Sequence, residues 1–191
     1  MKPVFYLLFF LPFVLFSQSN WQQKADYTMD VSFDVNTFKF NGSQEIVYTN
    51  NSPDTIRKVY YHLYFNAFKP GSQMDVRSLN ISDPDRRVKD RISKLNKNEE
   101  GDLSVFELKQ DGKPILFDKQ ETVLLARLKK ALLPGKKTKL SLVFSGTVPK
   151  QIRRSGRNNN DGVALSMTQW FPKLAEYDFE GWHPNPYIAR E

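Results

Sequence analysis

The sequence predicts a mainly β protein of antiparallel strands, arranged as a sandwich or as twisted sheets, with one short inserted helix. Apolar and polar residues alternate with a period of two in several short segments. Turn-forming pairs, such as Asp111-Gly112 and Pro134-Gly135, separate these segments. A helical period is found between Asp83 and Leu95. Many short strands with regular turns are typical of sandwiches and twisted antiparallel sheets.

The first residues have the pattern of a secretory signal peptide. Lys2 precedes an uncharged run from Val4 to Phe16, and the small residues Ser17 and Ser19 follow. The alternative is an uncleaved membrane anchor, which needs about 20 apolar residues, more than this run provides. We therefore expect a signal peptide at 1–19 and a single exported domain at 20–191.

The next segments predict a β-hairpin. Between Thr28 and Asn36, the apolar side chains Met29, Val31, Phe33 and Val35 alternate with polar ones, as in a strand with one buried face. A second strand is predicted from Ser43 to Thr49. The pair Asn41-Gly42 lies between the two segments and favours a tight turn there.

The segment from Ile56 to Phe65 is predicted to be a strand covered on both faces. One face is apolar, and the other carries the large side chains Tyr60, His62 and Tyr64. A strand with bulky residues on both faces needs two packing partners. The second partner could belong to this domain or to a neighbouring domain.

Downstream, the sequence predicts the helix and the remaining strands. Val88, Ile92 and Leu95 have helical spacing, Asp83 can cap the helix, and Pro84 suits its first turn. Strands are expected at 104–109, 114–117, 122–128, 139–144 and 163–169. The Asn-rich stretch at 153–162 predicts a mobile loop.

The charge pattern does not favour a nucleic-acid partner. The chain has a net charge of +7, but most of its basic residues are interspersed with acidic ones. One run lacks acids, and it consists of Lys150, Arg153, Arg154 and Arg157. We interpret it as a solvated loop, with binding to anions or an anionic surface as the alternative. Because the chain has no cysteine, it also lacks thiolate chemistry and disulfides.

The sequence contains no motif for catalysis. Zinc hydrolases commonly place two histidines one helical turn apart, whereas His62 and His183 are far apart in this chain. A zinc site built from both is a weak alternative, and His62 is better interpreted as part of an aromatic strand face. The G-x-S-x-G signature and phosphate-binding glycine loops are also missing. We therefore assign neither catalytic residues nor a bound metal to this chain.

The carboxy-terminal region carries the most specific motif. It contains Met167-Thr168-Gln169-Trp170-Phe171-Pro172, then Tyr177-Asp178, then the segment from Gly181 to Tyr187. Together with the early hairpin and the segment from Tyr61 to Phe68, this region resembles the amino-terminal domain of bacterial members of the aminopeptidase N family. These are zinc metallopeptidases that include membrane alanyl aminopeptidase.

The resemblance implies a saddle-like antiparallel domain that covers a catalytic domain absent from these residues, with zinc and a peptide substrate bound by the intact parent. It also implies that Gln169 reaches the substrate pocket. Many family members have an acidic residue two positions later, where this chain has Phe171, and Glu176 is a weak candidate to replace it. The H-E-x-x-H motif does not occur, and the closing strands of the domain are expected beyond Glu191.

A different class of function stays open. The chain could be a free-standing exported β-sandwich that binds a peptide, a glycan or a protein through its aromatic strand face. In both cases we expect a protein that is periplasmic, on the outer surface or secreted, and that meets the membrane only during export.

Overall fold

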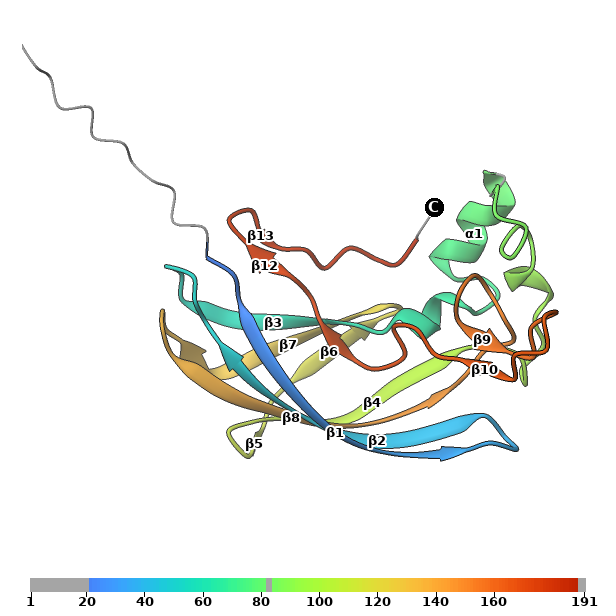
Figure 1. Cartoon of the computed structure of the whole chain (residues 1–191). Helices are drawn as coiled ribbons and strands as arrows, with labels where there is room; N and C mark the ends of the chain where they lie inside the picture. The colour runs from blue at the N-terminus through green and yellow to red at the C-terminus, as the bar shows by residue number, and fades with distance from the viewer. Residues whose placement is uncertain (1–20, 82–83, 189–191) are drawn as a thin grey trace, which may run out of the picture.

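Two antiparallel sheets make up most of the computed structural model, which describes residues 21–81 and 84–188 (Figure 1). The first sheet has the order β1-β2-β8-β4-β5 and the second has the order β11-β3-β7-β6. The strands of these sheets are β1 (Lys24–Asp34), β2 (Lys39–Thr49), β3 (Ile56–His62), β4 (Asp102–Gln110), β5 (Lys113–Pro114), β6 (Phe117–Gln120), β7 (Val123–Leu132), β8 (Lys137–Thr147) and β11 (Lys173–Leu174). The predicted mainly β, antiparallel fold is confirmed.

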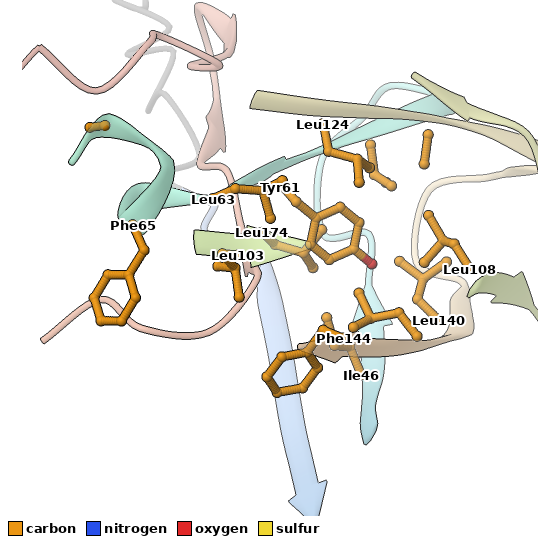
Figure 2. Packing of buried hydrophobic residues seen from close by; sticks show 14 of the residues in the cluster. Ile46, Tyr61, Leu63, Phe65, Leu103, Leu108, Leu124, Leu140, Phe144 and Leu174 are labelled. Atoms are coloured by element: carbon orange, nitrogen blue, oxygen red, sulfur yellow. The ribbon is translucent and has the colours of Figure 1, made fainter. Parts of the chain in front are cut away.

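The core lies between the two sheets. Tyr61 of β3 and Leu124 of β7 point toward Leu140 and Phe144 of β8, and all four side chains are fully buried (Figure 2). Burying such large apolar side chains is the main favourable contribution to folding. The apolar face predicted for the segment from Ile56 to Phe65 is therefore confirmed as a core face.

The first hairpin forms as predicted, but its turn is not at Asn41-Gly42. β1 and β2 pair antiparallel from Lys24↔Thr49 to Asp34↔Lys39, so that Asn41 and Gly42 lie inside β2. The turn occupies residues 35–38 because the Asp34 carboxylate accepts hydrogen bonds from the main-chain N–H groups of Asn36 and Thr37, at 2.8 and 3.3 Å. An aspartate that binds the next N–H groups is a strong turn former.

Gly42 is required for packing rather than for the turn. A Cβ atom at this position would lie 2.6 Å from Cζ of Phe144, a fully buried residue of the neighbouring strand β8. Glycine inside a strand often marks such a close approach. The Asn-Gly turn prediction was wrong for this reason.

The second face of β3 is covered by the chain itself. The Tyr60 ring lies 5.8 Å from that of Trp182, and main-chain N of Ala175 donates to the Tyr60 carbonyl at 2.8 Å. In Figure 1 the carboxy-terminal segment lies on the side of β3 that faces away from β8. This segment carries two short hairpin strands, β12 (Tyr177–Asp178) and β13 (Gly181–Trp182).

The α-helix lies earlier than predicted. It is α1 (Gln73–Asn80), and Ser72 caps it by accepting a hydrogen bond from Asp75 N at 3.1 Å. The region predicted to be helical forms turns and a short 3-10 helix, η2 (Ile92–Lys94), although Val88 and Ile92 are fully buried as expected. Lys89 has a positive φ of 37°, which interrupts an α-helix. The predicted cap, Asp83, lies outside the described residues.

The basic run at 150–157 is only partly solvated, because Lys150 and Arg154 are exposed whereas Arg153 is buried. Arg153 is only 4% exposed, and Lys150 pairs with Glu99 at 2.9 Å. Arg157 donates to the Asn98 carbonyl and lies 4.7 Å from the Phe38 ring. These contacts join the run to neighbouring loops. It also carries β9 (Gly156–Arg157), which pairs with β10 (Leu165–Ser166), a much shorter strand than the one predicted at 163–169.

Two other parts of the chain complete the description. A short 3-10 helix, η1 (Tyr64–Ala67), follows β3. In the described residues, no helix is long and apolar enough to cross a membrane. The predicted signal peptide lies outside them.

Candidate functional site

Gln169 lies between two hollows on the surface. One is a cavity of about 310 Å³, whose wall also includes Arg153, Ser155 and Thr168. The other is a more open depression of about 710 Å³, whose wall also includes His62 and His183. Tyr64 and Tyr187 line both, so these two rings and Gln169 form the boundary between the hollows.

The main chain of Gln169 has an unusual conformation. Its φ is 55°, in the left-handed region, which residues other than glycine seldom adopt. The side chain is exposed. A conformation of this kind costs roughly 1 kcal/mol and persists where the surrounding structure holds it.

The residues on each side of Gln169 hold that conformation. Ser155 accepts a hydrogen bond from Thr168 N at 2.9 Å, and its hydroxyl donates to the Thr168 carbonyl at 2.7 Å. On the other side, the Trp170 ring packs edge-on against Phe40 at 5.5 Å. Phe40 is fully buried, so Trp170 ties the chain to the core. Thr168 and Trp170 are thus both held in place, and the Gln169 side chain between them extends into solvent.

Aromatic contacts place the other boundary residues. Tyr64 and Tyr187 meet edge to face, with their ring centroids 4.9 Å apart, and the His62 ring stacks on Tyr64 at 5.0 Å. Thr122 accepts a hydrogen bond from Tyr187 N at 2.9 Å. Burial raises the pKa of Tyr64, with a smaller contribution from Tyr187. The tyrosine is therefore neutral at ordinary pH and offers a hydroxyl rather than a phenolate.

Apart from the two tyrosines, the ionisable groups of the walls are basic. Arg153 and Arg154 line the smaller cavity, His62 and His183 line the open depression, and none of the described residues that line either hollow is acidic. Burial lowers the pKa of His62, opposed by a hydrogen bond to the main chain of His183. His62 is therefore held neutral near pH 7.

The structure does not bring Glu176 to the walls of these hollows. Glu176 lines a different depression, together with Trp21 and Tyr177. Phe171, at the position where an acidic residue was considered, packs against Tyr27 at 5.7 Å and against Trp170 at 5.5 Å. Of the two residues proposed from the sequence, Gln169 alone lies at these hollows. Its role in substrate binding stays a prediction.

One group of potential metal ligands was not predicted from the sequence. Asp178, Glu180 and His183 place three potential metal-ligand atoms within 4.8 Å of one another. All three belong to the β12–β13 hairpin or follow it directly. The signal was present as a D-x-E-x-x-H spacing, but only the turn between the two short strands brings the ends of this pattern together.

The comparisons with known proteins give the following results. No protein-family model matches the sequence, and no curated protein matches it. Among solved structures, the M1 zinc metallopeptidase of Deinococcus radiodurans is similar, with 13% identity and a TM-score of 0.46, over 78% of this chain and 26% of that one. A mutant of it bound to a Tyr-Ser-Ala substrate matches at 12% identity and the same TM-score, over 85% and 29%.

A third structure, a two-domain M1 zinc metallopeptidase mutant bound to L-tryptophan, has 13% identity and a TM-score of 0.46, over 85% of this chain and 29% of that one. This chain therefore spans less than a third of the length of these structures. The names of these structures describe them as zinc metallopeptidases.

Proposed function

We propose that this chain is the amino-terminal, substrate-capping domain of an exported zinc aminopeptidase-like metallopeptidase. Peptide hydrolysis belongs to the intact parent and not to this chain alone. The observation that carries the proposal is the position of Gln169. Its side chain projects from a fixed, left-handed backbone position, between two hollows, at the residue that the family motif assigns to the substrate pocket.

An amide at this position suits a peptide ligand. A glutamine side chain both donates and accepts hydrogen bonds, so it can bind the main-chain groups of the first residue of a peptide. Tyr64 and Tyr187 add aromatic surface at the same boundary. These groups bind and orient a substrate, but none of them is an activated nucleophile or a general base.

The remaining chemistry belongs to the proposed catalytic domain. That domain would supply the zinc ligands, a glutamate base and a carboxylate for the ammonium group of the substrate, since the described walls here carry basic residues instead. Bound zinc would polarise the scissile carbonyl and activate water. The contribution of this chain is to cap the site and to exclude bulk water from it.

The first test of this proposal is the coding sequence that follows Glu191. We expect an open frame that encodes H-E-x-x-H and a further downstream glutamate, the pattern that places two histidines and the base on one helix. A stop codon directly after Glu191 would contradict the proposal. An open frame without that pattern would contradict it equally.

The structure favours the capping role over a free-standing binding module. The binding module requires the aromatic face of β3 to be available to a ligand. Instead, Tyr60 packs on Trp182, and His62 is only 9% exposed. The chain itself thus uses the side chains on which the alternative depends.

A further inference from the structure

The turn of the β12–β13 hairpin gathers nitrogen and oxygen donors from three side chains. Asp178 ends β12, Glu180 lies in the turn, and His183 follows β13 directly. One ligand atom from each residue lies within 4.8 Å of the others. Six consecutive residues thus supply an imidazole and two carboxylates to one small volume.

The main chain fixes this arrangement. His183 N donates to the Glu176 carbonyl at 2.9 Å, which sets the register of the hairpin at the histidine. Glu180 N donates to Oδ1 of Asp178 at 2.8 Å, which orients that carboxylate across the turn. The Asp178 carboxylate and the main chain at His183 are therefore held before any ligand arrives, which lowers the entropic cost of binding one.

The imidazole nitrogen that faces the carboxylates lacks a well-aligned partner. Nε2 of His183 is shielded from solvent and lies 2.8 Å from Oδ1 of Asp178, at ion-pair distance but without the geometry of a hydrogen bond. The short distance and the poor alignment mean that the contact is electrostatic and not a good hydrogen bond. A cation that lies among the three donors would give this nitrogen a partner, because the lone pair of the nitrogen would bind the cation.

We propose that Asp178, Glu180 and His183 bind a divalent transition-metal cation of the zinc type. Imidazole with carboxylates is a common ligand set for such ions, and Zn²⁺ binds these donors at about 2.0–2.2 Å. Donors already within 4.8 Å need only small side-chain rotations to reach that distance. The side chains of Asp178 and His183 are about one third exposed, so the same small rotations can open the shielded Nε2 to an ion and a completing water.

The imidazole also favours zinc over calcium. Ca²⁺ prefers six to eight oxygen donors. This site offers oxygen from two side chains and nitrogen from the third. We therefore expect Zn²⁺ to bind and Ca²⁺ to leave the site unchanged.

The simpler account of these residues is an ion pair. The Asp178 carboxylate raises the pKa of His183, as expected for an imidazole next to a carboxylate. In that case Glu180 has no function at the site and does not contribute to the affinity for a metal. The two accounts therefore differ in what removal of Glu180 does to metal binding.

Bound metal would act as a clasp on the carboxy-terminal segment. The hairpin carries Trp182, which packs on Tyr48 and Tyr60. Joining the two strands at their turn would hold this ring on the sheet. This inference is independent of the proposed peptidase function, because it concerns a metal held by the present chain alone.

The test is calorimetric titration of the full chain, purified without a histidine tag, with ZnCl₂ and separately with CaCl₂. The sequence provides a matched control because it contains only two histidines and no cysteine. We expect one Zn²⁺ per chain, no Ca²⁺, and unchanged affinity in His62→Gln. His183→Gln should weaken binding by at least about tenfold, as loss of a ligand requires.

Glu180→Gln keeps the test valid if the histidine variant folds poorly, because Glu180 is exposed. It should also weaken Zn²⁺ binding by at least about tenfold, whereas the ion-pair account predicts no change. Absence of Zn²⁺ binding at millimolar concentration would overturn the proposal. So would a Glu180→Gln chain that binds zinc as the unmodified chain does.

Discussion

Trp182 and Tyr60 pack with their rings 5.8 Å apart, and this contact joins the carboxy-terminal hairpin to the outer face of β3. Trp182 also lies 6.3 Å from Tyr48 and 5.0 Å from Tyr177. A single ring therefore links strands of both main sheets to the segment that follows Gln169. The position of that segment depends on aromatic packing, since β12 and β13 are only two residues each.

Replacing Trp182 by alanine should lower the free energy of unfolding by about 2 kcal/mol, less than for a fully buried tryptophan because this ring is half-buried. Urea denaturation of both chains measures the difference. Phe179→Ala is the control, because Phe179 lies in the same hairpin but is 87% exposed, and it should change the stability little. Equal effects of the two changes would show that the hairpin is not anchored by Trp182.

Gly42→Ala should destabilise the protein by about 1–3 kcal/mol, because the added methyl group meets the Phe144 ring at 2.6 Å. If this clash is the cause, Phe144→Leu should cost less in the Gly42→Ala background than in the unmodified chain. A double-mutant cycle by urea denaturation gives that coupling. Additive effects would place the cause of the glycine requirement elsewhere.

Most long strands were predictable because alternation reports which side chains face the core, and the core between β3, β7 and β8 enforces that alternation. The strand predicted at 114–117 was wrong, because β5 ends at Pro114 and β6 begins only at Phe117. The connections between strands were less predictable. Asn41-Gly42 is a strong local turn signal, but the contact of Gly42 with Phe144, more than a hundred residues away, places it inside a strand. The turn forms instead directly after Asp34, whose carboxylate accepts a hydrogen bond from the main-chain N–H of Asn36.

The helix and the site show the same limit. Val88 and Ile92 were correctly predicted to be buried, but they lie in turns and a short 3-10 helix and not in an α-helix. The spacing of buried residues does not specify the backbone conformation between them. Gln169 could be proposed from its motif. Its neighbours Arg153 and Tyr187 could not, because the cavity forms only when four separate stretches of the chain meet.

The turn at Asp34 predicts a pH-dependent contribution to stability. Hydrogen bonds from the Thr37 hydroxyl, and then from Asn36 N, lower the pKa of this carboxyl. Because its folded pKa lies below its unfolded one, near 3.9, its contribution is complete above about pH 4–5 and is lost as the pH falls through the folded value. Asp34→Ala should thus destabilise the chain at pH 7 but much less at about pH 2.

Urea denaturation at the two pH values checks this prediction. Asp30→Ala is the matched control, because Asp30 is also exposed and lies on the same face of β1. Because Asp30 lies within the strand and not at its turn, Asp30→Ala should not reproduce the loss of stability that Asp34→Ala causes at pH 7. A stability loss in Asp34→Ala that is the same at both pH values would mean that the charged form of Asp34 does not stabilise the turn.

Gln169→Gly should leave the stability of the chain unchanged or raise it by up to about 1 kcal/mol, because glycine adopts a φ of 55° without strain. Thermal denaturation of the two chains measures the effect. A large loss of stability would show that the glutamine side chain supports the fold. The residue would then need no functional explanation.

The same side chain should matter for activity in the intact parent. If its amide binds the first residue of a peptide, Gln169→Ala should lower kcat/KM for aminoacyl substrates by about tenfold, the effect of losing roughly one hydrogen bond. Gln120→Ala is the matched control, because Gln120 is exposed on β6 and lines neither hollow around Gln169. An intact enzyme whose kcat/KM is the same in both variants would retain the metallopeptidase assignment but remove Gln169 from the substrate pocket.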